Sequence, residues 1–354
     1  MSRPDAHDKD KRTGGPAKTS KCQGLTPTTK TSGPEGPPKH QKDMYTTGIM
    51  GSNAQLRNRL TGYTAGIIAG ISYGMNPLFG KELLAGGASV SSVLFFRYLF
   101  ATIFMAVLMM AKRESFAANR SQRLTLLILG VLFSCSSLFL FDAYNYIPAG
   151  LATTVVYLYP VFTALIMLFL KVKPSRQVWT SIMATLVGVF ILMDPLKSAA
   201  FNLTGAILSG LSALSYAGYL VIVNQSGKMK NLSAHTITFY ALATGTLIFL
   251  VQHLTEGGEF LHGISGKRDW LDLLGLGLVP TMVSLLALAM ATKSIGPTKT
   301  AVLGVFEPIT AIAIGTVAFG EPFTANVAVG AVICIGAIVF MILSGRQEAG
   351  SGQL

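Results

Sequence analysis

The sequence predicts an all-α polytopic membrane protein with ten transmembrane helices arranged as two inverted five-helix repeats. Three observations predict this fold: a composition of 51% hydrophobic and only 12% charged residues, a series of apolar blocks after Arg59, and an internal repeat. An ordinary soluble domain has roughly a quarter charged residues, so the composition excludes that class. The apolar blocks also lack the ten-residue alternation of barrel strands, which leaves a helical bundle as the structure that satisfies backbone groups in lipid.

Residues 1–59 are rich in Pro, Gly, Thr and Lys and contain few large apolar residues, which predicts a disordered basic cytoplasmic tail. This segment holds eleven of the 28 Lys and Arg. A start of translation at Met44 or Met50 is an alternative, under which much of the tail would not be translated.

Ten apolar segments follow, each of about the 20 residues that a helix needs to cross a bilayer core of about 30 Å. The first is the weakest, because it is rich in Gly and polar groups. The predicted spans are 61–80, 90–111, 124–144, 149–170, 177–193, 203–223, 233–253, 271–291, 298–319 and 323–344.

Positive charge is concentrated in alternate connections between these spans. With the N-terminus inside, 23 of the 28 Lys and Arg lie on the inner side and four on the outer side, while Arg97 falls within the second span. Because Lys and Arg favour the cytoplasmic side, both termini are predicted to be cytoplasmic. The same bias accounts for the net charge of +12 without a nucleic-acid partner. The compact core favours a bacterial inner membrane over an organelle membrane.

The two halves align without gaps over their last two spans. A constant shift of 148 residues pairs Tyr159 with Glu307 and Pro160 with Pro308, and a shift of 143 aligns the earlier spans. The predicted repeats cover 60–195 and 203–345, followed by a C-terminal tail over 346–354. Because five is odd, the second repeat enters the membrane from the opposite side, and inverted repeats are the usual construction of secondary transporters.

Four stretches carry a family resemblance: "ISYGMNPLFGKELL", "FFRYLFA", "FLFDAYNYIPAGLATTVVYLYPVFTALI" and "FEPITAI". In this order and spacing, over about residues 60–345, they resemble the EamA family of the drug/metabolite transporter superfamily. The resemblance implies a cavity lined mainly by helices 1, 3, 4, 6, 8 and 9, and alternating-access export or exchange of small metabolites, including amino acids. One departure is "LFLKVKP", where family members often have a Gly-Glu pair like that at 320–321.

Buried polar groups and helix breakers give the candidate substrate cavity. A carboxylate near the centre of a span must be protonated, paired or wetted, so Glu307 is expected to couple protons, to contact a substrate amine or to accept bonds from a neighbouring helix. Each of the two repeat-related prolines frees a carbonyl one turn earlier, at Val156 and Gly304. The candidate cavity residues are Tyr73, Asn76, Tyr157, Tyr159, Pro160, Tyr216, Tyr219, Glu307 and Pro308.

Three further charges are expected to have structural or coupling roles. The resemblance places Arg97 on a peripheral helix, which favours a structural anchor. Asp142 lies near the outer end of the third span, where it could pair with Lys81 or face the outer vestibule. Lys299 is expected to be a cytoplasmic anchor at the inner end of the ninth span.

Two other features complete the prediction. Gly62, Gly66, Gly70 and Gly74 recur every four residues, which predicts a close helix-packing or sliding surface. No nucleotide-binding motif, paired cysteine spacing or metal-ligand cluster is found in the sequence, so we expect no cofactor, no metal and no intrinsic ATPase. The alternatives are a sugar-phosphate or nucleotide-sugar carrier of the same superfamily and, less favoured, a membrane-embedded enzyme or scaffold. The sequence leaves the oligomeric state undetermined.

Overall fold

The structure, a computed structural model, describes residues 39–143, 145–147, 152, 155–193, 202–257, 259–320 and 323–351. The chain divides into two compact units, Met1–Gly51 and Ser52–Leu354, and only residues 39–51 of the first are described. The described residues form α1 (Lys39–Gly74), α2 (Asn76–Ala85), α3 (Val90–Ala111), α4 (Arg120–Ala143), α6 (Tyr159–Phe169), α7 (Arg176–Met193), α8 (Leu203–Gln225), η2 (Gly227–Met229), α9 (Ala234–Glu256), α10 (Lys267–Gly277), η3 (Leu278–Val283), α11 (Ser284–Ile295), α12 (Pro297–Leu303), α13 (Phe306–Phe319) and α14 (Ala325–Ser351).

The apolar segments of the sequence form these helices, and seven of them are long and apolar enough to cross a membrane. They include α3, whose bounds equal the predicted span 90–111, and the composite segments Lys267–Ile295 and Pro297–Phe319. Two more apolar helices, α6 and the apolar part of α7, are shorter. Large apolar side chains such as Phe169 and Val317 are 85% and 86% exposed, as expected of a surface that faces lipid.

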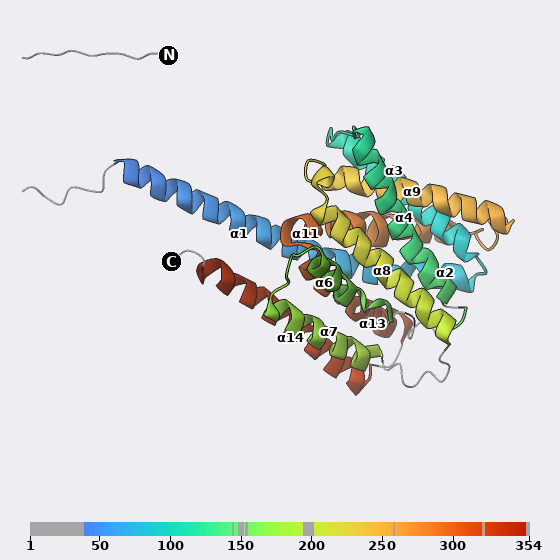
Figure 1. The fold of residues 1–354 in the computed structure, drawn as a ribbon. Coiled ribbons are helices and arrows are strands. Elements are labelled where there is room, and N and C mark those ends of the chain that lie inside the picture. Colours follow the sequence, from blue (N-terminus) through green and yellow to red (C-terminus); the bar gives the residue numbers. More distant parts are fainter. Residues whose placement is uncertain are drawn as a thin grey trace, which may run out of the picture. The chain divides into compact units, whose positions relative to one another are not determined.

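Helices of the first half pack against their counterparts in the second half. The second helices of the two repeats, α3 and α9, are in contact; so are the fourth and ninth through α6 and α12, and the fifth and tenth through α7 and α14. Figure 1 shows α7 and α14 side by side. The second, fourth and fifth helices of each repeat therefore pair with their counterparts across the two halves.

Prolines interrupt the helices at several points. A turn at Met75 separates α1 from α2, which has Pro77 in its first turn, and turns precede α6 at Pro160 and α13 at Pro308. Proline has no N–H to donate to the preceding turn, so a helix is easily broken there. At Pro280 the chain instead forms the π-helix η3 between α10 and α11. Three of the predicted spans, 61–80, 271–291 and 298–319, are thus each made of two or more consecutive helical segments.

The predicted disordered tail over 1–59 is wrong for residues 39–59, because α1 begins at Lys39. Once a helix is nucleated, each added residue gains one backbone hydrogen bond, so the apolar part of α1 can extend into polar sequence. The rest of that tail, together with Glu321 and Pro322, lies outside the described residues. The predicted C-terminal tail continues α14 as far as Ser351.

The glycine face of α1 packs directly on the second half, as predicted. A Cβ on Gly62 would lie 2.7 Å from Cβ of Ser294, and one on Gly70 would lie 2.8 Å from Cβ of Phe306. At Gly74 it would overlap the backbone oxygen of Glu307. Only glycine allows this approach, which brings α1 onto the break between α12 and α13.

Replacing Gly74 with Ala should lower the midpoint of thermal unfolding in detergent. The added methyl group meets backbone rather than a flexible side chain, and overpacking of this kind costs about 1–3 kcal/mol. Gly210→Ala in α8 is the matched control, because a Cβ added at that position would have nothing within 4 Å of it. The close packing of α1 is contradicted if the two variants unfold at the same temperature.

Candidate functional site

A cavity of about 410 Å³ lies where the interrupted helices meet, near the ends of α2 and α10 and the start of α3. Its volume is in the range of small-molecule sites, about 300–1,000 Å³. Most of the wall is apolar. The lining residues are Tyr73, Gly74, Asn76, Pro77, Gly80, Leu84, Val90, Val93, Leu94, Arg97, Leu140, Tyr157, Leu276, Glu307, Pro308 and Ala311.

Arg97 supplies the cation of this cavity. Its side chain is buried, with 7% exposed, and its Nε donates to Oγ1 of Thr281 at 2.6 Å. Nη2 donates to the carbonyl of Pro280 at 3.5 Å, and the guanidinium lies 5.4 Å from the centre of the Tyr73 ring. The expected peripheral position of Arg97 is therefore corrected, because α3 packs on η3 and carries the guanidinium to the cavity wall. The bonds to Thr281 and Pro280 agree with the expected anchoring role.

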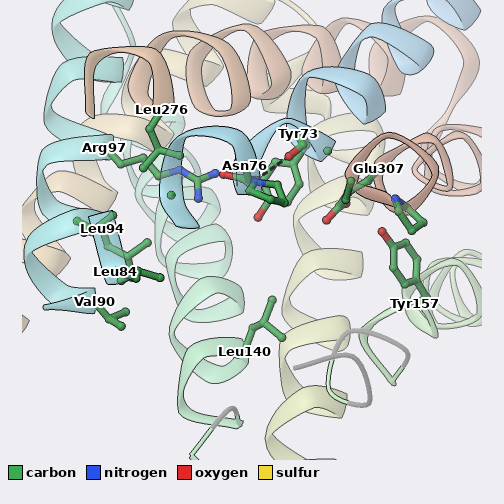
Figure 2. Close-up of a pocket in the computed structure, with 16 residues that line it drawn as sticks. Tyr73, Asn76, Leu84, Val90, Leu94, Arg97, Leu140, Tyr157, Leu276 and Glu307 are labelled. Atoms are coloured by element: carbon green, nitrogen blue, oxygen red, sulfur yellow. Dashed lines mark hydrogen bonds between the residues drawn. The ribbon is translucent and has the colours of Figure 1, made fainter. Parts of the chain in front are cut away.

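Glu307 supplies the carboxylate from the first turn of α13. Figure 2 shows Arg97 and Glu307 reaching the cavity from different walls, with Tyr73 and Asn76 between them. Among the ion pairs of the described residues, none joins these two charges. The cavity therefore presents a guanidinium and a carboxyl group that are not in direct contact with each other.

Two buried polar atoms at the cavity make no hydrogen bond of good geometry within the described part of the chain. They are Oδ1 of Asn76 and the hydroxyl of Tyr157. The amide nitrogen of Asn76 is occupied, since it donates to the Tyr73 carbonyl at 2.7 Å, while the Tyr157 hydroxyl is directed toward Glu307. Buried polar atoms are rarely left unpaired, so Oδ1 of Asn76 is available to a ligand.

The structure brings together five of the predicted cavity residues at this cavity: Tyr73, Asn76, Tyr157, Glu307 and Pro308. The other four are packed away from it. Tyr159 and Tyr219 are buried in the core with Pro160, and Tyr216 reaches only a narrow space of about 10 Å³ beside Glu307.

The two remaining charged candidates also lie away from the cavity. Asp142 is exposed near the end of α4, and the side chain of Lys81 lies outside the described residues. Lys299 lines a separate hollow at the opposite end of the bundle.

The prediction of an unpaired carbonyl at Gly304 is wrong. That carbonyl accepts the backbone N–H of Glu307 at 2.9 Å. The reason is that the chain turns at Gly304 and Val305, so a bond spanning three residues replaces the bond spanning four that Pro308 cannot make.

Sequence reasoning missed Thr281 and Pro280, which hold Arg97. Thr281 is 2% exposed and also donates to the carbonyl of Leu276 at 2.7 Å. A signal was present in the sequence: Pro280 interrupts an otherwise apolar span, and π-helical turns are frequent at functional sites. No group of three or more His, Cys, Asp or Glu that could hold a metal ion occurs among the described residues.

Thr281→Val should destabilise the protein, whereas Thr281→Ser should not. Valine keeps the volume but removes the acceptor for Arg97 Nε, and a buried donor left without a partner costs about 1–3 kcal/mol, more when it is charged. Thermal unfolding in detergent measures the difference. If Thr281→Val unfolds at the same temperature as Thr281→Ser, the contact does not hold Arg97.

Comparisons with known proteins agree with this architecture. An uncharacterized transporter of Archaeoglobus fulgidus is 26% identical over 78% of this chain and 95% of its own length. The uncharacterized inner membrane transporter YicL of Salmonella typhimurium is 22% identical over 80% of this chain and 95% of its own length. A UDP-galactose/UDP-glucose transporter of Arabidopsis thaliana is 29% identical over 51% of this chain and 58% of its own length.

A solved crystal structure matches with a TM-score of 0.67 over 81% of this chain and 98% of that chain, at 16% identity, which shows a shared fold. The sequence signature of the EamA-like transporter family matches twice, over residues 60–194 and 203–343. These two matches cover most of the chain and coincide with the two halves that pair in the structure. The chain is an integral membrane protein that belongs to the EamA-like transporter family.

Proposed function

We propose that the protein is an alternating-access carrier that exports a small metabolite of the amino-acid class. The observation that carries this proposal is the opposed pair of charges, Arg97 and Glu307, in one cavity of about 410 Å³. An amino acid has a carboxylate and an ammonium group, which the guanidinium and the carboxylate can bind respectively. Its side chain would lie against the apolar wall.

The geometry of the two charges supports this orientation. The Arg97 guanidinium is fixed by Thr281 and by the face of Tyr73, and arginine suits carboxylates because its planar donors match the two oxygens. The Tyr157 hydroxyl is directed toward Glu307, and between the two charged groups Oδ1 of Asn76 has no hydrogen-bond partner within the described residues. An ammonium group could donate to Glu307 and to that oxygen.

A nucleotide-sugar or sugar-phosphate carrier is the second candidate, because one relative is named a UDP-galactose/UDP-glucose transporter. A diphosphate would pair with Arg97, the only cation among the cavity-lining residues described. However, it would also bring its negative charge near Glu307, and like charges in a poorly solvated site repel strongly. The charge balance of the cavity favours a zwitterion.

We further propose ten membrane crossings with both termini in the cytoplasm of a bacterial cell, and repeat units over 60–195 and 203–345. The distribution of Lys and Arg supports the orientation. Cavity lining by the interrupted helices supports alternating access, because transporters of this construction bind substrates where their helices are discontinuous.

Transport by purified protein in liposomes, with a panel of radiolabelled amino acids and a UDP-sugar, tests the proposed substrate class. Glu307→Gln should raise KM for the transported amino acid about 10- to 100-fold, because a hydrogen bond to a charged group contributes about 1.5–3 kcal/mol. Arg97→Lys should also raise KM, since lysine cannot reproduce the planar pair of donors.

Asp142→Asn is the control, because it removes an exposed carboxylate outside the cavity and should leave KM unchanged. Repeating the uptake measurements with and without a proton gradient shows whether transport is coupled to protons, separately from any effect on substrate binding. Uptake of a UDP-sugar but of no amino acid would refute the proposed substrate class and support the second candidate.

Labelling of single cysteines from each side of the membrane tests the topology. In a variant without native cysteines, Ser115→Cys in the α3–α4 connection should react with an impermeant maleimide from the cytoplasmic side only. Ser265→Cys before α10 should react from the outside only. Both parent serines are exposed, so reaction of the two cysteines from one common side would contradict the proposed number of crossings.

A further inference from the structure

Three hollows follow the broken helix α12–α13 from one end of the bundle to the other. The cavity described above reaches Glu307, Pro308 and Ala311. A hollow of about 350 Å³ at the other end is lined by the start of this helix, at Pro297, Thr298 and Lys299. Between them lies a space of only about 10 Å³, which touches Thr300, Gly304 and Glu307. That space has room for about one water molecule, so the path is closed there.

Tyr159 of the first repeat packs directly behind this narrow space, against two of the residues that line it, Tyr216 and Gly304. Its hydroxyl donates to the carbonyl of Ala301 in α12 at 2.9 Å, and its side chain is 3% exposed. Its ring meets Tyr216 edge-on, with the ring centres 4.8 Å apart. The contact therefore joins α6 of the first repeat to the helix of the second repeat that carries Glu307.

Gly304 provides the space that this hydroxyl occupies. A Cβ at position 304 would overlap the Tyr159 hydroxyl, so no larger residue is compatible with the present position of the ring. The Ala301 carbonyl also accepts the N–H of Gly304 at 3.1 Å. The turn in the helix thus keeps a hydrogen bond of its own when the tyrosine leaves.

We propose that Tyr159, seated against Gly304, is a gating residue that closes the pathway between the cavity and the Lys299 end of the bundle. The gate opens when the Tyr159 hydroxyl leaves the Ala301 carbonyl and the ring moves out of the space beside Gly304. This inference rests on the alternating access proposed above. It adds that the Tyr159–Ala301 hydrogen bond and the fit of the Tyr159 ring against Gly304 help to hold the closed side.

The neighbours of Tyr159 connect this gate to the ligand cavity. The ring of Tyr157, which lines the cavity, lies 6.1 Å from the ring of Tyr159. Tyr216 contacts the ring of Tyr159 and lines the narrow space together with Glu307. A ligand that moves Tyr157 therefore acts on a ring that packs against Tyr159, and one that moves Glu307 changes the space that Tyr216 lines.

A cysteine at position 300 reports directly on the gate. Thr300 is 1% exposed and lines the narrow space, so Thr300→Cys in a cysteine-free variant should react slowly with a charged methanethiosulfonate from the Lys299 side. Adding Tyr159→Phe should speed that reaction about 2- to 12-fold, the shift that loss of one hydrogen bond gives to a two-state equilibrium. The exposed Ser115→Cys variant calibrates access of the reagent to that side.

Tyr219→Phe is the matched control, because it removes a buried hydroxyl that has no hydrogen-bond partner within the described residues. It should leave the labelling rate at position 300 unchanged. Gly304→Ala is the second variant: its methyl group should displace the ring and speed labelling at least as much as Tyr159→Phe.

Equal labelling rates in the Tyr159→Phe, Gly304→Ala and parent proteins would overturn the gate, and so would equal acceleration by Tyr219→Phe. The assay contains no substrate, so its outcome is independent of which metabolite is carried. If the protein transports an amino acid but labelling at position 300 does not respond to Tyr159→Phe or Gly304→Ala, only this inference is rejected. If labelling responds but no amino acid is transported, only the substrate class is rejected.

Discussion

Backbone hydrogen bonding inside lipid is the constraint on which the rest of this structure depends. A bilayer core offers no partners, so a helix can be interrupted only where the freed groups are rebonded or face a cavity. Three proline interruptions follow this rule, because a bond spanning three residues closes the turn in each: Met75 to Ser72, Leu158 to Val155 and Glu307 to Gly304. Residues at all three interruptions line the ligand cavity. The breaks and the cavity are thus a single feature of the fold.

The two cavity charges are placed at some energetic cost. Burying a charged group is unfavourable unless hydrogen bonds or an opposite charge replace its water. Arg97 has neutral acceptors, a hydroxyl and a carbonyl, and a ring face instead of a carboxylate. Because no ion pair joins Arg97 and Glu307, the proposed zwitterionic substrate would provide a partner for each of them.

Local pattern predicted the helical segments and the glycine face of α1, because these depend on periodicity within one helix, and self-alignment of the sequence predicted the two repeats. It also placed Tyr73, Asn76 and Glu307 at one site. It did not predict that Arg97 meets Thr281, since the two residues are 184 positions apart and the π-turn that aligns them changes the rotation of the helix. The same uncertainty in rotation, introduced by the break before Pro160, is why Tyr159 was expected in the cavity but packs beside it.

The fit of Tyr159 into the notch at Gly304 also limits how the sequence can change. An alanine at 304 conflicts with a ring at 159, whereas a small residue at 159 would leave the same alanine room. The two positions lie in different repeats, yet the effect of a substitution at one depends on the residue at the other, as is usual for side chains in contact. In a family built from duplicated halves, such a pair makes the substitutions accepted in one half depend on the residues present in the other half.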